Sequence, residues 1–398
     1  METYLFETVS LLGRWLHIIV GIAWIGASFY FVWLDNHLLS PAHSTNGGVA
    51  GELWAVHGGG FYHSQKYRVA PPALPGTLHW FYWEAYSTWL SGMLLLCLIY
   101  YGRAELYLID ARVAALSKPA AVAIGLGSLA ASWLIYDALC RSPLGRNDRL
   151  LGIAVAVVLT AEAWLLCNLF SGRGAFIQFG AALGTIMVAN VFFVIIPGQR
   201  ELVRAKQEQR EPDPVHGLRG KQRSVHNTYF TLPVLFTMIS NHAASTFGAR
   251  YNWLVLIGMS LAGACIRGWF VARHKARERG GRTSPALAIA GVVLLGAVAV
   301  ALAPVQINPL QRTRAESARI EAIFAQRCVP CHAQVPTHPA FASAPNGIML
   351  DTPERIQASL VLTQQQLRSR AMPLGNLTGM SEQERAAVLA WIEHGAPR

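Results

Sequence analysis

Long apolar stretches alternate with short polar ones along most of the chain. Eight of the apolar stretches are long enough, at about 20 residues each, to cross a bilayer as helices. They cover residues 11–34, 84–101, 119–139, 150–170, 175–197, 227–246, 253–271 and 285–304. The pattern predicts an all-α fold whose main part is an eight-helix transmembrane bundle.

The chain becomes polar after the eighth stretch, and this change predicts a domain boundary. Residues 306–314 contain Pro309 and two arginines, a composition typical of a short linker. We therefore expect a membrane catalytic domain over 1–305, a linker over 306–314 and a second, small domain over 315–398.

The second domain contains the motif Cys328-Val329-Pro330-Cys331-His332. A C-x-x-C-H sequence is typical of covalent attachment of a c-type haem, in which the two thiols add to the two vinyl groups and the histidine binds the iron. The alternative is half of a zinc site, which needs two further Cys or His ligands. Only two histidines follow the motif, so we favour haem c, held by Cys328 and Cys331 with His332 as proximal ligand.

Two predicted helices flank the motif. The first begins at Ala315 and runs into the cysteines, and its apolar face is formed by Ile320, Ile323 and Phe324. The second covers residues 382–394, with Ser381 as N-cap and Glu384 three residues later. This order of elements is typical of a small class I cytochrome c.

Such domains usually supply a methionine as the sixth iron ligand from a downstream loop. Met372 precedes Pro373, whose fixed backbone suits a loop that points a thioether at the iron. Met380 is the second candidate, and Met349 is too close to the attachment motif. We predict His332 and Met372 as the ligands of the haem iron.

The composition agrees with a membrane protein. Hydrophobic residues make up 53% of the 398 residues and charged residues 14%, which excludes a single soluble globule. The four cysteines outside the motif fall in or beside apolar stretches and make no disulfide framework; they are Cys97, Cys140, Cys167 and Cys265. The net charge of +11 comes largely from loops between apolar stretches, so we expect no nucleic-acid partner.

Two arguments predict the same topology in a bacterial inner membrane. Haem c is attached outside the cytoplasm, and an even number of spans then places the N-terminus and the second domain together in the periplasm. On that topology the cytoplasmic loops hold seventeen Lys and Arg residues and the periplasmic loops five. This distribution obeys the positive-inside rule.

Polar side chains within the predicted spans indicate a site, because a charge at mid-membrane costs about 3 kcal/mol. The candidates are Arg14, His17 and Trp24 in the first span, Glu84 at the start of the second, Glu162 in the fourth, and Asn241 and His242 in the sixth. Most of them fall in the periplasmic half. The alternatives are ordinary hydrogen bonds between helices, or two histidines that hold a b-type haem.

Five segments carry a family resemblance. They are His17 with Gly21-Ile22-Ala23-Trp24-Ile25-Gly26-Ala27-Ser28, then Gly58-Gly59-Gly60-Phe61-Tyr62, His79-Trp80-Phe81-Tyr82-Trp83-Glu84, His226-Asn227, and Ser240-Asn241-His242. Together they resemble the bacterial membrane-bound urate oxidase, a family with an eight-span domain fused to cytochrome c. The chain departs from the family pattern at Tyr82, where a Lys is usual, and at Ala243, where a Tyr is usual.

The resemblance implies hydroxylation of urate to 5-hydroxyisourate with water, and electrons that pass to the fused haem. We expect Arg14 to bind the urate anion, Asn241 to orient it, and His17 or His242 to act as general base. Glu162 is then expected to orient a histidine, and Trp24 and Glu84 to contact the substrate. A terminal oxidase or a soluble cytochrome would take the electrons onward.

Two other functions fit parts of the pattern. A quinol to cytochrome c electron-transfer protein would use the histidines of the spans to hold haem b. A transporter or sensor would carry the haem domain for redox control and would show no substrate-dependent haem reduction.

Overall fold

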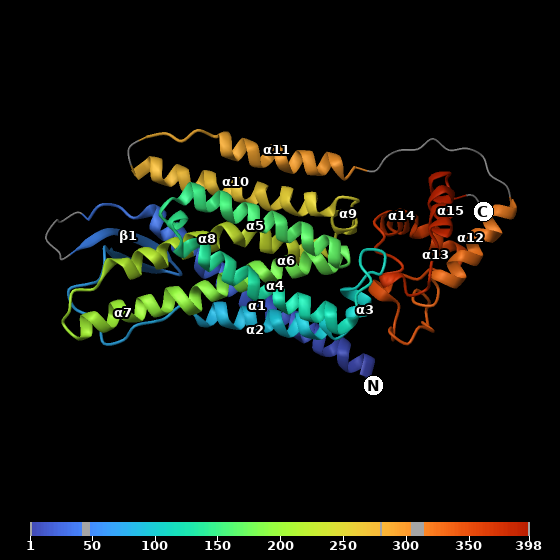
Figure 1. Ribbon diagram of the computed structural model, residues 1–398, viewed down its shortest axis with the longest axis horizontal. Helices are drawn as coiled ribbons and strands as arrows, with labels where there is room; N and C mark the ends of the chain where they lie inside the picture. Colours follow the sequence, from blue (N-terminus) through green and yellow to red (C-terminus); the bar gives the residue numbers. More distant parts are fainter. Residues whose placement is uncertain (1, 42–47, 279–280, 304–313, 397–398) are drawn as a thin grey trace.

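The computed structural model describes residues 2–41, 48–278, 281–303 and 314–396, and this part of the chain is mostly helical. Figure 1 shows the long helices as one elongated bundle. They are α1 (Glu2–His37), α2 (Trp83–Leu95), α4 (Lys118–Arg141), α5 (Asp148–Leu169), α6 (Gly172–Asn190), α8 (Pro214–Ser240), α10 (Asn252–Glu278) and α11 (Ala286–Ala301). Each of the eight predicted stretches overlaps one of these helices, although the bounds differ. The predicted linker lies outside the described residues, apart from Arg314.

Five helices among the described residues are long and apolar enough to cross a membrane, which is compatible with a membrane protein. They are Tyr4–His37, Lys118–Arg141, Asp148–Leu169, Gly172–Gln207 and Asn252–His274. The fourth is α6 continued through a π-helical turn (Val191–Ile195) into α7 (Ile196–Gln207). Helix α2, which continues as a π-helical turn (Leu96–Tyr101), α8 and the 16-residue α11 do not meet these criteria. The count of eight spans therefore stays a prediction.

Helix α6 forms the centre of the bundle. Phe176, Phe179 and Leu183 on it are fully buried against neighbouring helices. A side chain at Gly180 would meet the Thr237 hydroxyl of α8 at 2.0 Å, so this glycine lets the two helices approach closely. The helix starts follow ordinary capping chemistry, with the Asn147 side chain accepting hydrogen bonds at the start of α5.

A β-hairpin, which the sequence analysis did not predict, follows α1. Strand β1 (Val49–His57) pairs antiparallel with β2 (Gly60–Tyr67). The turn between them uses Gly58 and Gly59, whose φ angles of +58° and +82° suit glycine. The hairpin lies at one end of the bundle (Figure 1).

Residues 314–396, which we call the haem-motif domain, lie at the opposite end of the bundle (Figure 1). Their helices are α12 (Arg314–Arg327), α13 (Pro353–Ala358), α14 (Leu360–Arg368) and α15 (Glu382–Glu393). The predicted apolar face is confirmed, because Ile320, Ile323 and Phe324 are buried in the core of this domain. The capping box of Ser381 and Glu384 is also present at the start of α15.

The haem-motif domain contacts the bundle through two short helices, α3 (Ala104–Tyr107) and α9 (Ala244–Phe247). Two glycines allow close approach there. A side chain at Gly248 would meet the Ser369 carbonyl oxygen at 2.1 Å, and one at Gly375 would meet the Glu105 carbonyl oxygen at 2.8 Å. The start of α1 lies at the same end of the bundle as this domain (Figure 1), as the predicted topology requires.

Candidate functional site

A cavity of about 1070 Å³ extends from the interior of the bundle to the haem motif. Its bundle side is lined by residues of α1, α2, α6 and α8, and its other side by residues of the haem-motif domain. The cavity therefore brings together most of the residues that the sequence singled out in two separate parts of the chain.

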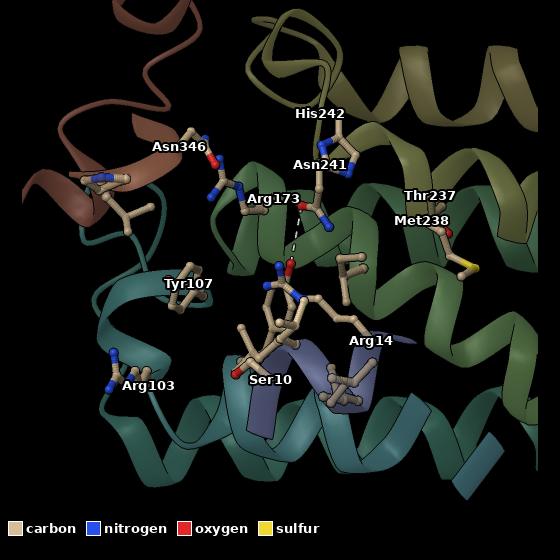
Figure 2. Close-up of a pocket in the computed structure, with 18 of the residues that line it drawn as sticks. Ser10, Arg14, Arg103, Tyr107, Arg173, Thr237, Met238, Asn241, His242 and Asn346 are labelled. Carbon is tan, nitrogen blue, oxygen red and sulfur yellow. Dashed lines mark hydrogen bonds between the residues drawn. The ribbon is translucent and has the colours of Figure 1, made fainter. Parts of the chain in front are cut away.

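Two arginines and an amide line the bundle side of the cavity. Figure 2 shows Arg14 of α1 extending toward Asn241, which follows α8, whereas Arg173 at the start of α6 extends toward Asn346 of the haem-motif domain. The Tyr100 hydroxyl donates a hydrogen bond to Asn241 Oδ1 at 3.3 Å, which orients the amide. Arg173 also lies over the Phe247 ring, 5.2 Å from its centroid. This wall presents guanidinium donors suited to a planar anion.

His17 lies deeper on the cavity wall, against α2. Its Nδ1 is 2.9 Å from the Ser91 hydroxyl, and that hydroxyl donates its own hydrogen to the Thr88 carbonyl at 3.0 Å. In the arrangement in which the Ser91 hydroxyl donates to Thr88, Nδ1 donates to the Ser91 oxygen and Nε2 is left as a hydrogen-bond acceptor. A neutral imidazole with a free Nε2 can accept a proton.

The remaining predicted residues divide into two groups. Trp24 and His242 line the cavity; His242 lies exposed in the turn that follows α8. Glu162 and Glu84 do not line it. The Glu162 carboxylate accepts a hydrogen bond from Ser132 of α4. Glu84 lies in the first turn of α2, which runs toward the haem-motif domain from the other end of the bundle. The structure therefore places neither carboxylate at the cavity, and the expected contacts of Glu162 with a histidine and of Glu84 with the substrate stay predictions that the cavity lining does not support.

The haem motif forms a compact turn after α12. The His332 amide donates to the Cys328 carbonyl at 2.9 Å, and His332 Nδ1 donates to the Ile348 carbonyl at 2.9 Å. The second bond leaves Nε2 for a metal and fixes the ring, as is usual for histidine ligands. Burial raises the pKa of the Cys328 thiol to about 12 and also raises the pKa of Cys331. These apolar surroundings fit two sulfurs bonded to a porphyrin.

Met372 lines the same cavity as Cys328, Cys331 and His332. Met380 is buried in the core of the haem-motif domain instead. Arg385 is almost fully buried and donates to the Met372 carbonyl at 2.6 Å, which holds the methionine loop in place. Within the described residues, no group of three or more His, Cys, Asp or Glu side chains could hold a metal ion, so the zinc alternative has no support there. The residues present fit haem c.

The sequence analysis missed several cavity residues, namely Tyr100, Arg103, Tyr107 and Arg173. The sequence did contain a signal that the two arginines are functional. Only five basic residues fall in the loops predicted to be periplasmic, and Arg103 and Arg173 are two of them. Basic residues are rare on that side, so each one deserved a functional interpretation.

Comparison with known families identifies the larger part of the chain. The urate oxidase N-terminal family matches residues 3–303, about three quarters of the chain. The chain belongs to this family. Membership indicates urate-related oxidation, and hence an oxidoreductase with urate as substrate. The haem-motif domain lies outside the matched region, and the cavity joins it to the family's domain. Searches among curated proteins and among solved structures gave no match.

Proposed function

We propose that this protein is a membrane-bound urate oxidase that passes its electrons to a covalently bound haem c. Urate reacts with water to give 5-hydroxyisourate, two electrons and two protons. A C–O bond forms at C5, the oxygen comes from water, and no oxygen molecule is consumed at this site. A terminal oxidase or a soluble cytochrome takes the electrons from the haem.

One observation carries the proposal: a single cavity is lined by Arg14, Arg173 and His17 on one side and by the haem motif on the other. Urate is an anion at neutral pH, so the two guanidinium groups bind it by charge-assisted hydrogen bonds. The Asn241 side chain donates and accepts hydrogen bonds at the edge of the purine ring, and the Trp24 ring packs against the substrate as an apolar surface. The family relationship and the cavity thus support the same substrate independently.

A histidine acts as the general base in this mechanism. His17 Nε2, left free by the bond of Nδ1 to Ser91, takes a proton from the attacking water as the C5–O bond forms. His242, on the same cavity, is the alternative base. Cys328, Cys331, His332 and Met372 are the residues that would hold haem c, and the haem would supply a one-electron acceptor. The two electrons of each turnover must therefore leave one after the other.

The proposed placement is a bacterial inner membrane, with the N-terminus and the haem-motif domain in the periplasm. Five helices long enough to span a bilayer support it, as do the positions of the N-terminus and this domain at one end of the bundle. The excess of Lys and Arg in the opposite loops agrees with this orientation.

Anaerobic mixing of the purified protein with urate tests the proposal. The expected result is reduction of haem c, seen as the sharpened α and β absorption bands, together with formation of 5-hydroxyisourate at one molecule per two electrons. A pyridine haemochrome spectrum is recorded on the same sample. Haem c that stays oxidised with urate but is reduced by quinol, together with a b-type haem band, would establish quinol to cytochrome c electron transfer instead.

A further inference from the structure

A second pocket, of about 950 Å³, lies at the end of the bundle away from the haem-motif domain. It is formed by the end of α4 and the short 3₁₀ helix after it (Pro143–Arg146), by α7, and by the start of α8. Five arginines and a histidine line it, and Glu201 is its one acidic residue among the described part of the chain. The basic residues are Arg141, Arg146, Arg204, Arg219, Arg223 and His216. The pocket is thus strongly cationic and separate from the urate cavity.

The nearby carboxylates are already engaged. Asp137 pairs with Arg141 at 2.5 Å and with Arg223 at 2.7 Å, and Glu201 pairs with Arg204 and with Arg210 outside the pocket. Arg146 and Arg219 are exposed and have no ion pair within the residues that the structure describes. Two guanidinium groups therefore face a concave space with their charge uncompensated.

The walls of the pocket are fixed by bonds that do not involve these two arginines. Gln222 donates to the Gly145 carbonyl at 2.9 Å, which ties α8 to the turn after α4. Gly145 is packed so tightly that a side chain there would meet the Cys140 carbonyl oxygen at 2.1 Å. The ion pair between Arg223 of α8 and Asp137 of α4, whose side chains are only 5% and 15% exposed, connects the two helices at the base of the pocket. The site is preorganised before any ligand arrives.

We propose that this pocket binds a phosphate-bearing anion, with Arg146 and Arg219 as its principal ligands. Guanidinium groups match phosphate oxygens in bidentate geometry, and a preformed cradle of several arginines favours phosphate over a single carboxylate. The positive-inside rule explains basic residues on this side of the bundle, but it does not require them to converge on one pocket. The phosphate comes either from a soluble molecule or from the headgroup of an anionic phospholipid, since the pocket lies at the end of spanning helices.

The test uses the full haem-containing protein in nanodiscs. In the first arm, protein in phosphatidylcholine nanodiscs is titrated with inorganic pyrophosphate by calorimetry. In the second arm, protein in nanodiscs of mixed phosphatidylglycerol and phosphatidylcholine is analysed by native mass spectrometry for retained phosphatidylglycerol. Binding in the first arm identifies a soluble phosphate ligand, and selective retention in the second arm alone identifies a lipid headgroup.

The double variant Arg146→Gln/Arg219→Gln should bind about tenfold more weakly or worse in whichever arm is positive, because two charge-assisted contacts are lost. The matched control is Arg149→Gln/Lys221→Gln, which removes the same charge from neighbouring positions outside the pocket lining. Arg146→Lys/Arg219→Lys keeps the charge and the fold and should bind with intermediate affinity. The proposal is overturned if neither arm shows binding, or if the control weakens binding as much as the pocket variant.

Discussion

At the scale of single residues, His17 on the cavity wall is held by a hydrogen bond to Ser91 behind it. The pair fixes which imidazole nitrogen is free, and general-base catalysis depends on that nitrogen. Arg14 and Arg173 come from helices far apart in sequence and supply two cations to one anion-sized wall. In the proposed mechanism His17 removes a proton and the two arginines bind the substrate, so substitutions at these positions should affect the rate of the reaction and the binding of urate separately.

We predict that His17→Ala lowers the rate of urate-dependent haem reduction by about 10²- to 10⁴-fold, the usual contribution of a general base. Ser91→Ala should cost less, because the ring stays but loses its orienting partner. Stopped-flow absorbance of haem c under saturating urate measures both rates. An unchanged rate in His17→Ala would transfer the role of base to His242, whose Ala variant is the companion experiment.

Arg14→Gln and Arg173→Gln are predicted to weaken urate binding, each by about 10- to 100-fold, because a hydrogen bond to a charged group contributes about 1.5–3 kcal/mol. The effect should appear in KM more than in kcat. Arg250→Gln is the matched control, since Arg250 stacks on Tyr251 and does not line the cavity. Equal effects in all three variants would point to a general loss of positive field rather than to binding contacts.

Arg385 is predicted to be a positioning residue for the sixth iron ligand. Its guanidinium donates to the Leu367 and Met372 carbonyls at 3.2 and 2.6 Å, so Arg385→Lys should loosen the methionine loop. Loss of the thioether lowers the reduction potential of haem c, which an anaerobic redox titration measures. Arg355→Lys, at a residue paired with Asp351 in the same domain, should leave the potential unchanged. A normal potential in Arg385→Lys would mean that the loop holds its own conformation.

At the scale of elements, the two short helices α3 and α9 determine how the haem-motif domain sits on the bundle. Gly248 after α9 lies against Ser369, and Gly375 lies against Glu105 of α3. Both contacts are backbone to backbone, so neither neighbour can move aside as a flexible side chain would. The distance between the bundle side of the cavity and the haem motif on its other side is therefore sensitive to the size of these two residues.

Gly248→Leu should separate the two parts and slow urate-dependent haem reduction, since displacements of about 1 Å can cost around 10²-fold in a positioned reaction. The haem spectrum and reduction potential should stay as in the unmodified protein, because the haem ligands are untouched. Gly152→Leu is the control; Gly152 lies on α5 with no atom near the position of a new Cβ. Wild-type kinetics in Gly248→Leu would show that the contact is dispensable.

The sequence predicted elements better than it predicted the contacts between them. The eight helices and the helices around the haem motif follow from apolar runs and periodicity, which are local signals. The β-hairpin was missed because its strands hold few of the regular alternations that mark a half-buried sheet. Periodicity placed Glu162 in a span but did not determine which neighbouring helix its side chain would face. In the structure it faces α4, where it accepts a hydrogen bond from Ser132. Arg173 and Tyr100 reach the cavity only through the packing of α6 and α2, which no local pattern specifies.

At the scale of the whole molecule, charges act across the junction of its two parts. Asp110, in the loop after α3, binds Arg112 in a bidentate ion pair with a shortest distance of 2.7 Å. Burial alone would raise the pKa of the Asp110 carboxyl, but its hydrogen bonds and charge interactions with Arg112, and the charge of Arg370, hold it below its ordinary value. Arg112 in turn is attracted by the negative charge of Glu382 and repelled by the positive charge of Arg385. Asp110 thus offsets a cluster of arginines contributed by both parts of the protein.

Docking of the haem-motif domain onto the bundle should depend on pH. A carboxyl group whose pKa is lowered in the folded protein stabilises it at every pH above the unfolded pKa of about 3.9, and this contribution is lost as pH falls through the folded value. Docking of the haem-motif domain should therefore be constant from pH 7 to about pH 5 and loosen below about pH 4. Asp110→Asn should loosen it at pH 7, because Arg112, Arg370 and Arg385 then repel one another with one negative charge fewer, although Glu382 still offsets part of the repulsion.

Hydrogen exchange of α9 and α14 measures this docking directly, since both helices lie at the junction. After correction for the pH dependence of intrinsic amide exchange, the protection of these helices in Asp110→Asn at pH 7 should fall toward that of the unmodified protein in acid. Asp351→Asn is the control. The pKa of Asp351 is also lowered, by hydrogen bonds from Arg355 and from the Gln334 amide, but these partners lie within the haem-motif domain. If Asp351→Asn speeds exchange at the junction as much as Asp110→Asn does, the effect comes from destabilising the domain and not from charges across the contact.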